Sequence, residues 1–216
     1  MATAGLSSPP APEVEAPLLI TGFQAFGGWA YNPTAIVAPA VAASLGIPHA
    51  ILPVVMEAAP AALAAARAAH RPAFTLHLGL SGRAPLLQLE RVAVNIADFR
   101  IPDAAGRQPR AQRLVDGAPD GLMTGIDLHD LASSVPGTAI SNSAGTFLCN
   151  ALYFHALLAS ARRSLFVHVP PTPDLRPPAS RTEDGLPVLH GVPLEVQITA
   201  VESIARYLLA RLESPA

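Results

Sequence analysis

The sequence predicts a single-domain α/β protein, a three-layer α/β/α fold with a mostly parallel central sheet. Short apolar runs alternate with longer segments of helical character along most of the chain, which is typical of β-α-β units. The apolar runs are continuous, as expected of parallel strands that are buried on both faces. With 216 residues, the chain is long enough to bury a substantial core within one domain.

The first half of the chain shows the order β-α-β-α-β. Strands are predicted over residues 18–23, 49–56 and 73–80, and helices over residues 35–45 and 57–70. Asn32 can cap the first helix, Pro33 suits its first turn, and Gly46 ends it.

The second half departs from simple alternation. Residues 86–100 mix β-branched and polar residues, which indicates strands with one wet face, and residues 101–119 form a Pro/Gly-rich loop. Further elements are predicted as a strand over residues 138–143, a helix over 147–161, a strand over 165–169 and a long helix over 194–212.

The N-terminal segment 1–16 is rich in Pro, Ala and Ser and lacks apolar periodicity. We therefore expect a disordered leader there and a folded domain over residues 17–216. No basic segment followed by an apolar one indicates a signal peptide, and no run is long enough for a membrane span, so no membrane partner is expected. The single cysteine excludes an internal disulfide and indicates a reducing compartment, with the cytoplasm as the expected location.

The composition narrows the class of partner. Hydrophobic residues make up 50% of the chain and charged residues 14%, with a net charge of -2, which argues against a disordered chain and against a nucleic-acid binder. A small or peptidic partner is favoured. No metal or cofactor is expected, because the chain lacks a metal-ligand spacing such as H-E-x-x-H and lacks the phosphate-loop and dinucleotide fingerprints.

The only cysteine, Cys149, lies between a predicted strand and a predicted helix. A thiol at a helix N-terminus is favoured as thiolate by the helix dipole, and the free N–H groups there can hold an oxyanion. An inert core cysteine is the ordinary alternative, because free cysteines are among the most buried residues. His168 interrupts an apolar strand near its C-terminal end, where α/β folds place their sites, and it is a candidate base.

A cysteine nucleophile with a histidine base usually needs a third group to orient the imidazole. The acidic candidates are Glu90, inside an apolar stretch, and Asp98 and Asp103, on either side of Arg100. Each could instead be a surface or ion-paired carboxylate. Spacing alone does not choose among the three.

Four sequence blocks follow one another along the chain. They read ITGFQAFGGWAYNPT, GLSGRAPLLQLERVAVNIADFRIPDAAGRQP, SNSAGTFLCN and FVHVPPTPD. With these blocks in this order, residues 18–212 resemble pyroglutamyl peptidase I, a family also called pyrrolidone-carboxylate peptidase. The resemblance implies a thiol protease without a cofactor that removes N-terminal pyroglutamate from peptides and forms a homo-oligomer, either a dimer or a tetramer.

The resemblance also implies roles for individual residues. Its triad falls on Cys149, His168 and Glu90, with the carboxylate orienting the imidazole. The substrate-binding residues that it implies are Phe23, Phe26, Asn32, Arg100, Ile101, Phe147 and Leu148.

The chain departs from the family pattern at three places. Leu80 follows Gly79 where family members commonly carry a glutamine that helps to read the lactam. The stretch between the cysteine and the histidine is somewhat short, and the loop 171–192 is unusually rich in proline. Leu80 indicates one alternative, an amidase for another N-acyl or lactam group. A second alternative is a lactam-binding homologue without turnover, which the matching triad residues disfavour.

Overall fold

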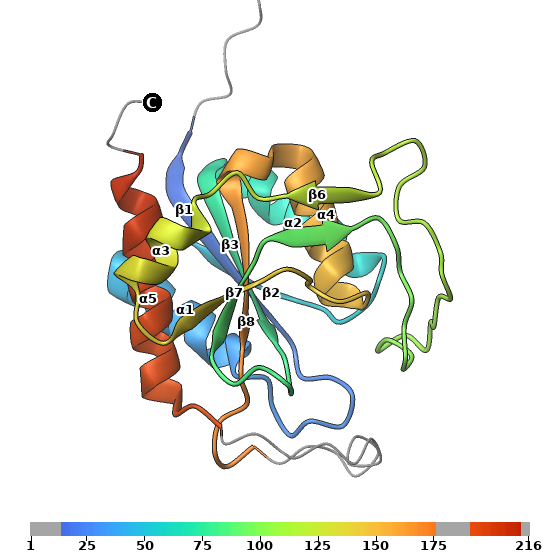
Figure 1. Ribbon diagram of the computed structural model, residues 1–216, viewed down its shortest axis with the longest axis horizontal. Helices are drawn as coiled ribbons and strands as arrows, with labels where there is room; N and C mark the ends of the chain where they lie inside the picture. The colour runs from blue at the N-terminus through green and yellow to red at the C-terminus, as the bar shows by residue number, and fades with distance from the viewer. Residues whose placement is uncertain (1–13, 176–190, 213–216) are drawn as a thin grey trace, which may run out of the picture.

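The structure is a computed structural model that describes residues 14–175 and 191–212. A six-stranded sheet forms its centre, in the spatial order β2-β1-β3-β8-β4-β7 (Figure 1). The strands are β1 (Ala16–Phe23), β2 (His49–Leu52), β3 (Pro72–Leu80), β4 (Leu87–Glu90), β7 (Thr138–Ser141) and β8 (Ser164–Val169). A small second sheet joins β5 (Val92–Val94) to β6 (Gly121–Met123).

The predicted mostly parallel sheet is confirmed, with one exception in strand direction. The strands β2, β1, β3 and β8 are parallel to one another, but β4 is antiparallel to β8, and β7 runs parallel to β4. The cause lies in the connection from β3 to β4, which consists only of residues 81–86. A parallel crossover needs a dozen or more residues, so the chain turns back and enters β4 in the opposite direction.

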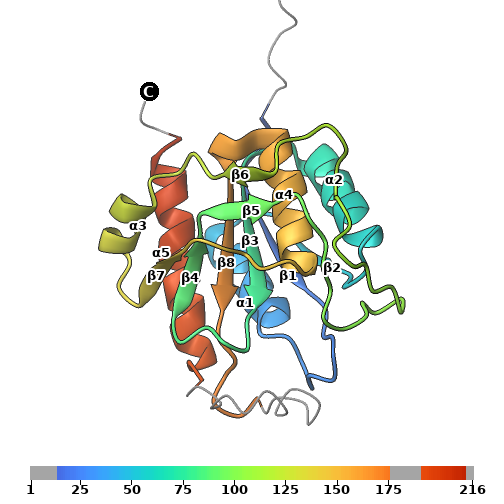
Figure 2. The same ribbon diagram turned by 45° about the vertical axis from the view of Figure 1, so that its right-hand side comes forward.

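Helices cover both faces of the sheet (Figures 1 and 2). They are α1 (Thr34–Leu45), α2 (Ala58–His70), α3 (Leu128–Ser134), α4 (Leu148–Ser160) and α5 (Leu194–Ala210), with a 3₁₀ turn at Ala161–Arg163. Leu18 and Ile20 of β1 pack with α1, α3 and α5, whereas Leu19 packs on the other side with α2 and α4. Successive strand residues alternate between faces, and all three side chains are fully buried, as the continuous apolar run predicts.

The start of α1 follows the predicted signals. Asn32 accepts hydrogen bonds through Oδ1 from the Thr34 backbone N (3.1 Å) and the Thr34 hydroxyl (2.9 Å). Pro33 occupies the N-cap position itself, and the helix ends at Gly46 in the left-handed conformation (φ 64°). Only glycine adopts that conformation without a steric cost.

Some boundaries differ from those predicted. The second strand ends at Leu52, four residues early, and β6 and α3 were not predicted because each is too short to show a period. The sheet begins at Ala16, which pairs with Pro72, so the last residue assigned to the leader belongs to β1. Residues 1–13 of the predicted leader and most of the loop 171–192 lie outside the described residues. None of the described helices is both long enough and apolar enough to cross a membrane.

Candidate active site

Cys149 is the second residue of α4 and is half-buried. Phe147 occupies the N-cap position but provides no side-chain hydrogen bond to the helix, and the first intrahelical bond runs from the Ala151 N–H to the Phe147 carbonyl (3.1 Å). The N–H groups of the first turn therefore have no capping side chain. Such a helix start favours a negative charge nearby, on a thiolate or on an oxyanion.

The next residue, Asn150, holds this helix start in place. Its side chain is fully buried and accepts a hydrogen bond from the Val94 N–H (2.8 Å). It also donates to the carbonyls of Val94 (2.9 Å) and Ile96 (3.0 Å). Asn150 was not predicted as a functional residue, because an asparagine in a first helical turn resembles an ordinary capping residue. Here it joins α4 to β5 instead.

Glu90 and His168 meet across the antiparallel pair of β4 and β8. Glu90 is the last residue of β4 and pairs with Phe166, so it lies diagonally opposite His168 on the same face of the sheet. The Glu90 Oε1 atom is 2.7 Å from Nδ1 of His168. Both side chains are buried, with 1% and 10% of their surfaces exposed. The short loop that reverses β4 is therefore what brings this carboxylate to the imidazole.

The imidazole of His168 also forms a hydrogen bond with the Cys149 side chain. Burial by itself lowers the pKa of His168, but hydrogen bonds and charges from Cys149 and Glu90 outweigh this effect and raise the pKa from 6.5 to about 10. The proton is therefore held on the imidazole at neutral pH when the sulfur carries the negative charge. Three side chains from α4, β8 and β4 thus form a connected chain.

The other two acidic candidates accept hydrogen bonds from backbone N–H groups of loops. Asp98 accepts a hydrogen bond from the Ala111 N–H (3.4 Å). Asp103 accepts hydrogen bonds from three backbone N–H groups, those of Met56 (2.8 Å), Ala105 (2.9 Å) and Arg107 (2.9 Å). Of the three acidic candidates, Glu90 is therefore the one that contacts His168 in this structure.

A small apolar pocket opens beside Cys149. It is lined by Phe23, Phe26, Asn32, Val54, Leu80, Phe147, Leu148 and Cys149. Five of the seven predicted substrate-binding residues are in this set, but Arg100 and Ile101 are not. Arg100 is exposed. The residue before it, Phe99, is buried, and its ring packs on that of Phe147 with 4.4 Å between centroids. The aliphatic side chain of Val54 was not predicted as a lining residue, whereas Leu80 stands where the resemblance places a residue that reads the lactam.

Asn32 supplies the only amide side chain in this pocket wall, and the loop uses both ends of that amide. Its Nδ2 group donates to the Gln24 carbonyl (3.1 Å), and Oδ1 accepts the two hydrogen bonds from Thr34. The Thr34 hydroxyl in turn accepts from the Phe23 N–H (2.9 Å). Asn32 therefore shapes the loop that carries Phe26.

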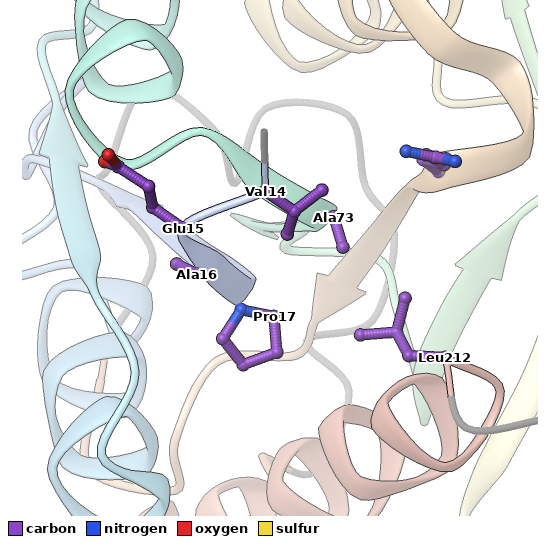
Figure 3. Close-up of a pocket in the computed structure, with 7 residues that line it drawn as sticks. Val14, Glu15, Ala16, Pro17, Ala73 and Leu212 are labelled. Atoms are coloured by element: carbon purple, nitrogen blue, oxygen red, sulfur yellow. The ribbon is translucent and has the colours of Figure 1, made fainter. Parts of the chain in front are cut away.

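A second, open cavity of about 440 Å³ lies at the opposite end of the sheet (Figure 3). It is lined by Val14, Glu15, Ala16, Pro17, Ala73, Arg163 and Leu212. Glu15 is ion-paired with Arg71 rather than available to a ligand. No cysteine or histidine lines this cavity, so it offers no second reactive centre. Among the described residues, no group of three or more metal-ligating side chains is placed to hold a metal ion.

Comparison with known proteins shows the family to which the chain belongs. A family model described as "Pyroglutamyl peptidase" matches residues 16–208. The chain belongs to the pyroglutamyl peptidase family. A pyrrolidone-carboxylate peptidase of Streptomyces coelicolor is 36% identical over 192 residues, which cover 81% of this chain and 88% of that protein. Another, from Vibrio parahaemolyticus, is 34% identical over 169 residues, covering 73% and 79%.

Solved structures give the same result at the level of the fold. The pyrrolidone carboxyl peptidase of Thermococcus litoralis superimposes with a TM-score of 0.79 at 30% identity, covering 92% of this chain and 95% of that one. Pyroglutamyl peptidase I of Bacillus amyloliquefaciens gives a TM-score of 0.78 at 28% identity, covering 91% and 98%. Glu90, Cys149 and His168 all lie within the residues that the pyroglutamyl peptidase family model matches.

Proposed function

We propose that this chain removes an N-terminal pyroglutamyl residue from peptides, with Cys149 as nucleophile, His168 as acid and base, and Glu90 orienting the imidazole. One observation carries the proposal: the connected side chains of these three residues lie at an uncapped helix start beside an apolar pocket. Membership of the pyroglutamyl peptidase family supports the same reaction.

The reaction is an acyl transfer in two halves. The Cys149 thiolate attacks the pyroglutamyl carbonyl carbon, and the oxyanion that forms faces the N–H groups at the start of α4. His168 then gives its proton to the leaving amine, and the shortened peptide departs, leaving a thioester. Water attacks the thioester and gives its proton to His168, after which the pyroglutamate leaves and the thiolate–imidazolium pair is restored.

The pocket suits an acyl group without charge. Pyroglutamate has no free α-amine, because its nitrogen is closed into a lactam, whereas an ordinary N-terminal residue carries an ammonium group. Burying that charge among aromatic and aliphatic side chains is costly. The rings of Phe26 and Phe147 both line the pocket, stacked with 6.0 Å between centroids and within 24° of parallel, and they supply apolar aromatic surface for a lactam ring.

The direct test is hydrolysis of a fluorogenic pyroglutamyl amide. We expect the wild type to turn it over, and we expect Cys149→Ala and His168→Gln to lower kcat by at least about 10³-fold. The matched control is His49→Gln, because His49 is an exposed histidine at the start of β2. Turnover that persists in Cys149→Ala would end the thioester mechanism.

The same assay should also test other acyl groups. Leu80 lines the pocket, and both ends of the Asn32 amide are already hydrogen-bonded within the loop, so the pocket could prefer a different acyl group. A panel of other small N-acyl amides separates an altered amidase from a pyroglutamyl peptidase.

We also propose that the protein is a cytoplasmic homo-oligomer, a dimer or a tetramer, and that it acts on peptides that begin with pyroglutamate. Sedimentation of the full chain tests the oligomer.

A further inference from the structure

Gly79 leaves no room for a side chain at the point where the reactive groups meet. It lies one residue before the end of β3 and pairs in register with His168 on β8. A β carbon at Gly79 would lie 2.7 Å from Cζ and 2.8 Å from Cε1 of Phe166, and 3.0 Å from Sγ of Cys149. Real β carbons essentially never approach other heavy atoms to less than 3.0 Å.

The sulfur of Cys149 lies beside the place where a side chain of residue 79 would project. Residues directly opposite each other on neighbouring strands project to the same face of a sheet, so a side chain at Gly79 would stand beside the His168 imidazole. The sulfur of Cys149 takes that position instead. It comes from α4, which covers the same face, and it reaches the imidazole over the bare backbone of Gly79.

Phe166 shares the space and is coupled to the imidazole. The centroid of its ring lies 4.9 Å from that of the His168 ring. The edge of the Phe166 ring, at Cζ and Cε1, faces Gly79 and would clash with a β carbon there. Phe166 is fully buried, and its ring also contacts Tyr153, with 5.6 Å between centroids. A β carbon would therefore press on two groups that both touch the imidazole.

We propose that Gly79 is a positioning residue: its missing side chain is the slot that holds the Cys149 sulfur against His168. The proposal rests on the proposed function of the cysteine. It does not concern substrate binding, because Gly79 is not among the residues that line the apolar pocket. Gly79→Ala therefore acts on kcat and leaves KM within about threefold.

The effect on kcat follows from the displacement. A misplacement of the reacting groups by about 1 Å costs on the order of 10²-fold in rate. We expect a decrease of that size in Gly79→Ala. The matched control is Gly121→Ala, another glycine in a strand, where a β carbon would meet nothing closer than 3.6 Å. It should leave both kcat and KM unchanged.

A double variant separates the sulfur from the packing. Phe166→Leu removes the ring edge, so that in Gly79→Ala/Phe166→Leu the remaining close contact is with Sγ. We expect the double variant to have nearly the Tm of Phe166→Leu alone but to keep the loss in kcat. Equal kcat in the double variant and in Phe166→Leu would overturn the proposal, because the loss would then come from packing against Phe166.

A second readout is independent of any substrate. Separating the sulfur from the imidazole removes the cation that favours thiolate, so alkylation of Cys149 by iodoacetamide at pH 6 should slow at least tenfold in Gly79→Ala and stay unchanged in Gly121→Ala. Unchanged alkylation in Gly79→Ala would overturn the positioning role. If the wild type is alkylated rapidly yet hydrolyses no pyroglutamyl amide, the proposed function fails while the positioning role stands.

Discussion

The Oε1 atom of Glu90 lies 2.7 Å from Nδ1 of His168, across 78 positions of sequence. This contact fixes the imidazole with Nδ1 toward the carboxylate, which leaves Nε2 for the sulfur of Cys149. It exists because β4 runs antiparallel to β8, whereas the other strand pairs of the central sheet are parallel. The direction of one short strand therefore decides which carboxylate supports the base.

Glu90→Gln should lower kcat by roughly 10²–10⁴-fold, because an amide neither carries the charge that stabilises the imidazolium nor fixes the same ring tautomer. KM should change little, since Glu90 does not line the pocket. Steady-state kinetics with a pyroglutamyl amide measures both constants. The control is Glu202→Gln, which removes a partly exposed carboxylate on α5 that is paired with Arg206. Wild-type kcat in Glu90→Gln would contradict the orienting role.

His168 should remain protonated well above neutral pH in the enzyme. Its pKa is raised from 6.5 to about 10 in the folded protein, so the protonated ring stabilises the fold fully below about pH 6.5, and this contribution is lost as the pH rises toward 10. The Tm advantage of the wild type over His168→Gln should therefore shrink between pH 7 and pH 10. NMR titration of the ring gives a direct check, and a midpoint near 6.5 would be incompatible with the ion pair.

Much of this architecture can be predicted from local sequence. The continuous apolar runs predicted the parallel strands, and Asn32, Pro33 and Gly46 predicted both ends of α1. Cys149 and His168 were identified as candidates because a thiol at a helix start and an imidazole at a strand end are unusual in otherwise apolar surroundings. Each of these signals lies within a few residues of the feature that it predicts.

The remainder depends on contacts between distant segments. Spacing could not separate Glu90 from Asp98 and Asp103, because all three are acidic residues next to apolar ones. The resemblance pointed to Glu90, but the physical reason is the antiparallel register of β4 on β8, which brings Glu90 beside His168 and which the residues around Glu90 do not encode. Asn150 was missed for the same reason, since its partners Val94 and Ile96 lie more than fifty residues away.

His77 should give the opposite pH dependence to His168. It is fully buried, with Nδ1 2.9 Å from the Thr21 hydroxyl. Burial, together with the positive charge of Arg67, lowers its pKa from 6.5 to about 3. The neutral ring therefore contributes stability above about pH 6.5, and this contribution is lost as the pH falls toward 3.

The test is acid unfolding of the wild type and of His77→Asn, which keeps a polar group near Thr21 but does not titrate. We expect the variant to be less stable at pH 7, because a buried ring is replaced by a smaller side chain, and to show a flatter decline in Tm between pH 6.5 and pH 4. His49→Asn is the exposed control and should leave the slope unchanged. An unaltered slope in His77→Asn would show that another group governs acid stability.

Asn150 should prove important to both stability and catalysis. Asn150→Ala leaves the Val94 N–H and the Ile96 carbonyl without this partner, whereas the Val94 carbonyl keeps the hydrogen bond that it accepts from the Ile96 N–H (2.8 Å). A buried polar group without a partner costs about 1–3 kcal/mol, and local relaxation recovers part of the total, so we expect a loss of about 2–4 kcal/mol in the free energy of unfolding. Because the same contacts hold the start of α4, kcat should also fall.

Asn150→Asp provides a sharper test of the same contacts. The carboxylate still accepts from the Val94 N–H, but it sets a negative charge against two carbonyl oxygens, so it should destabilise the protein more than alanine does at pH 8. The control is Asn142→Ala, where an exposed asparagine accepts from Arg91, and there the loss should stay below about 0.5 kcal/mol. Denaturant unfolding gives the three values. If Asn150→Ala matched the control, α4 would have to be anchored by its apolar packing alone.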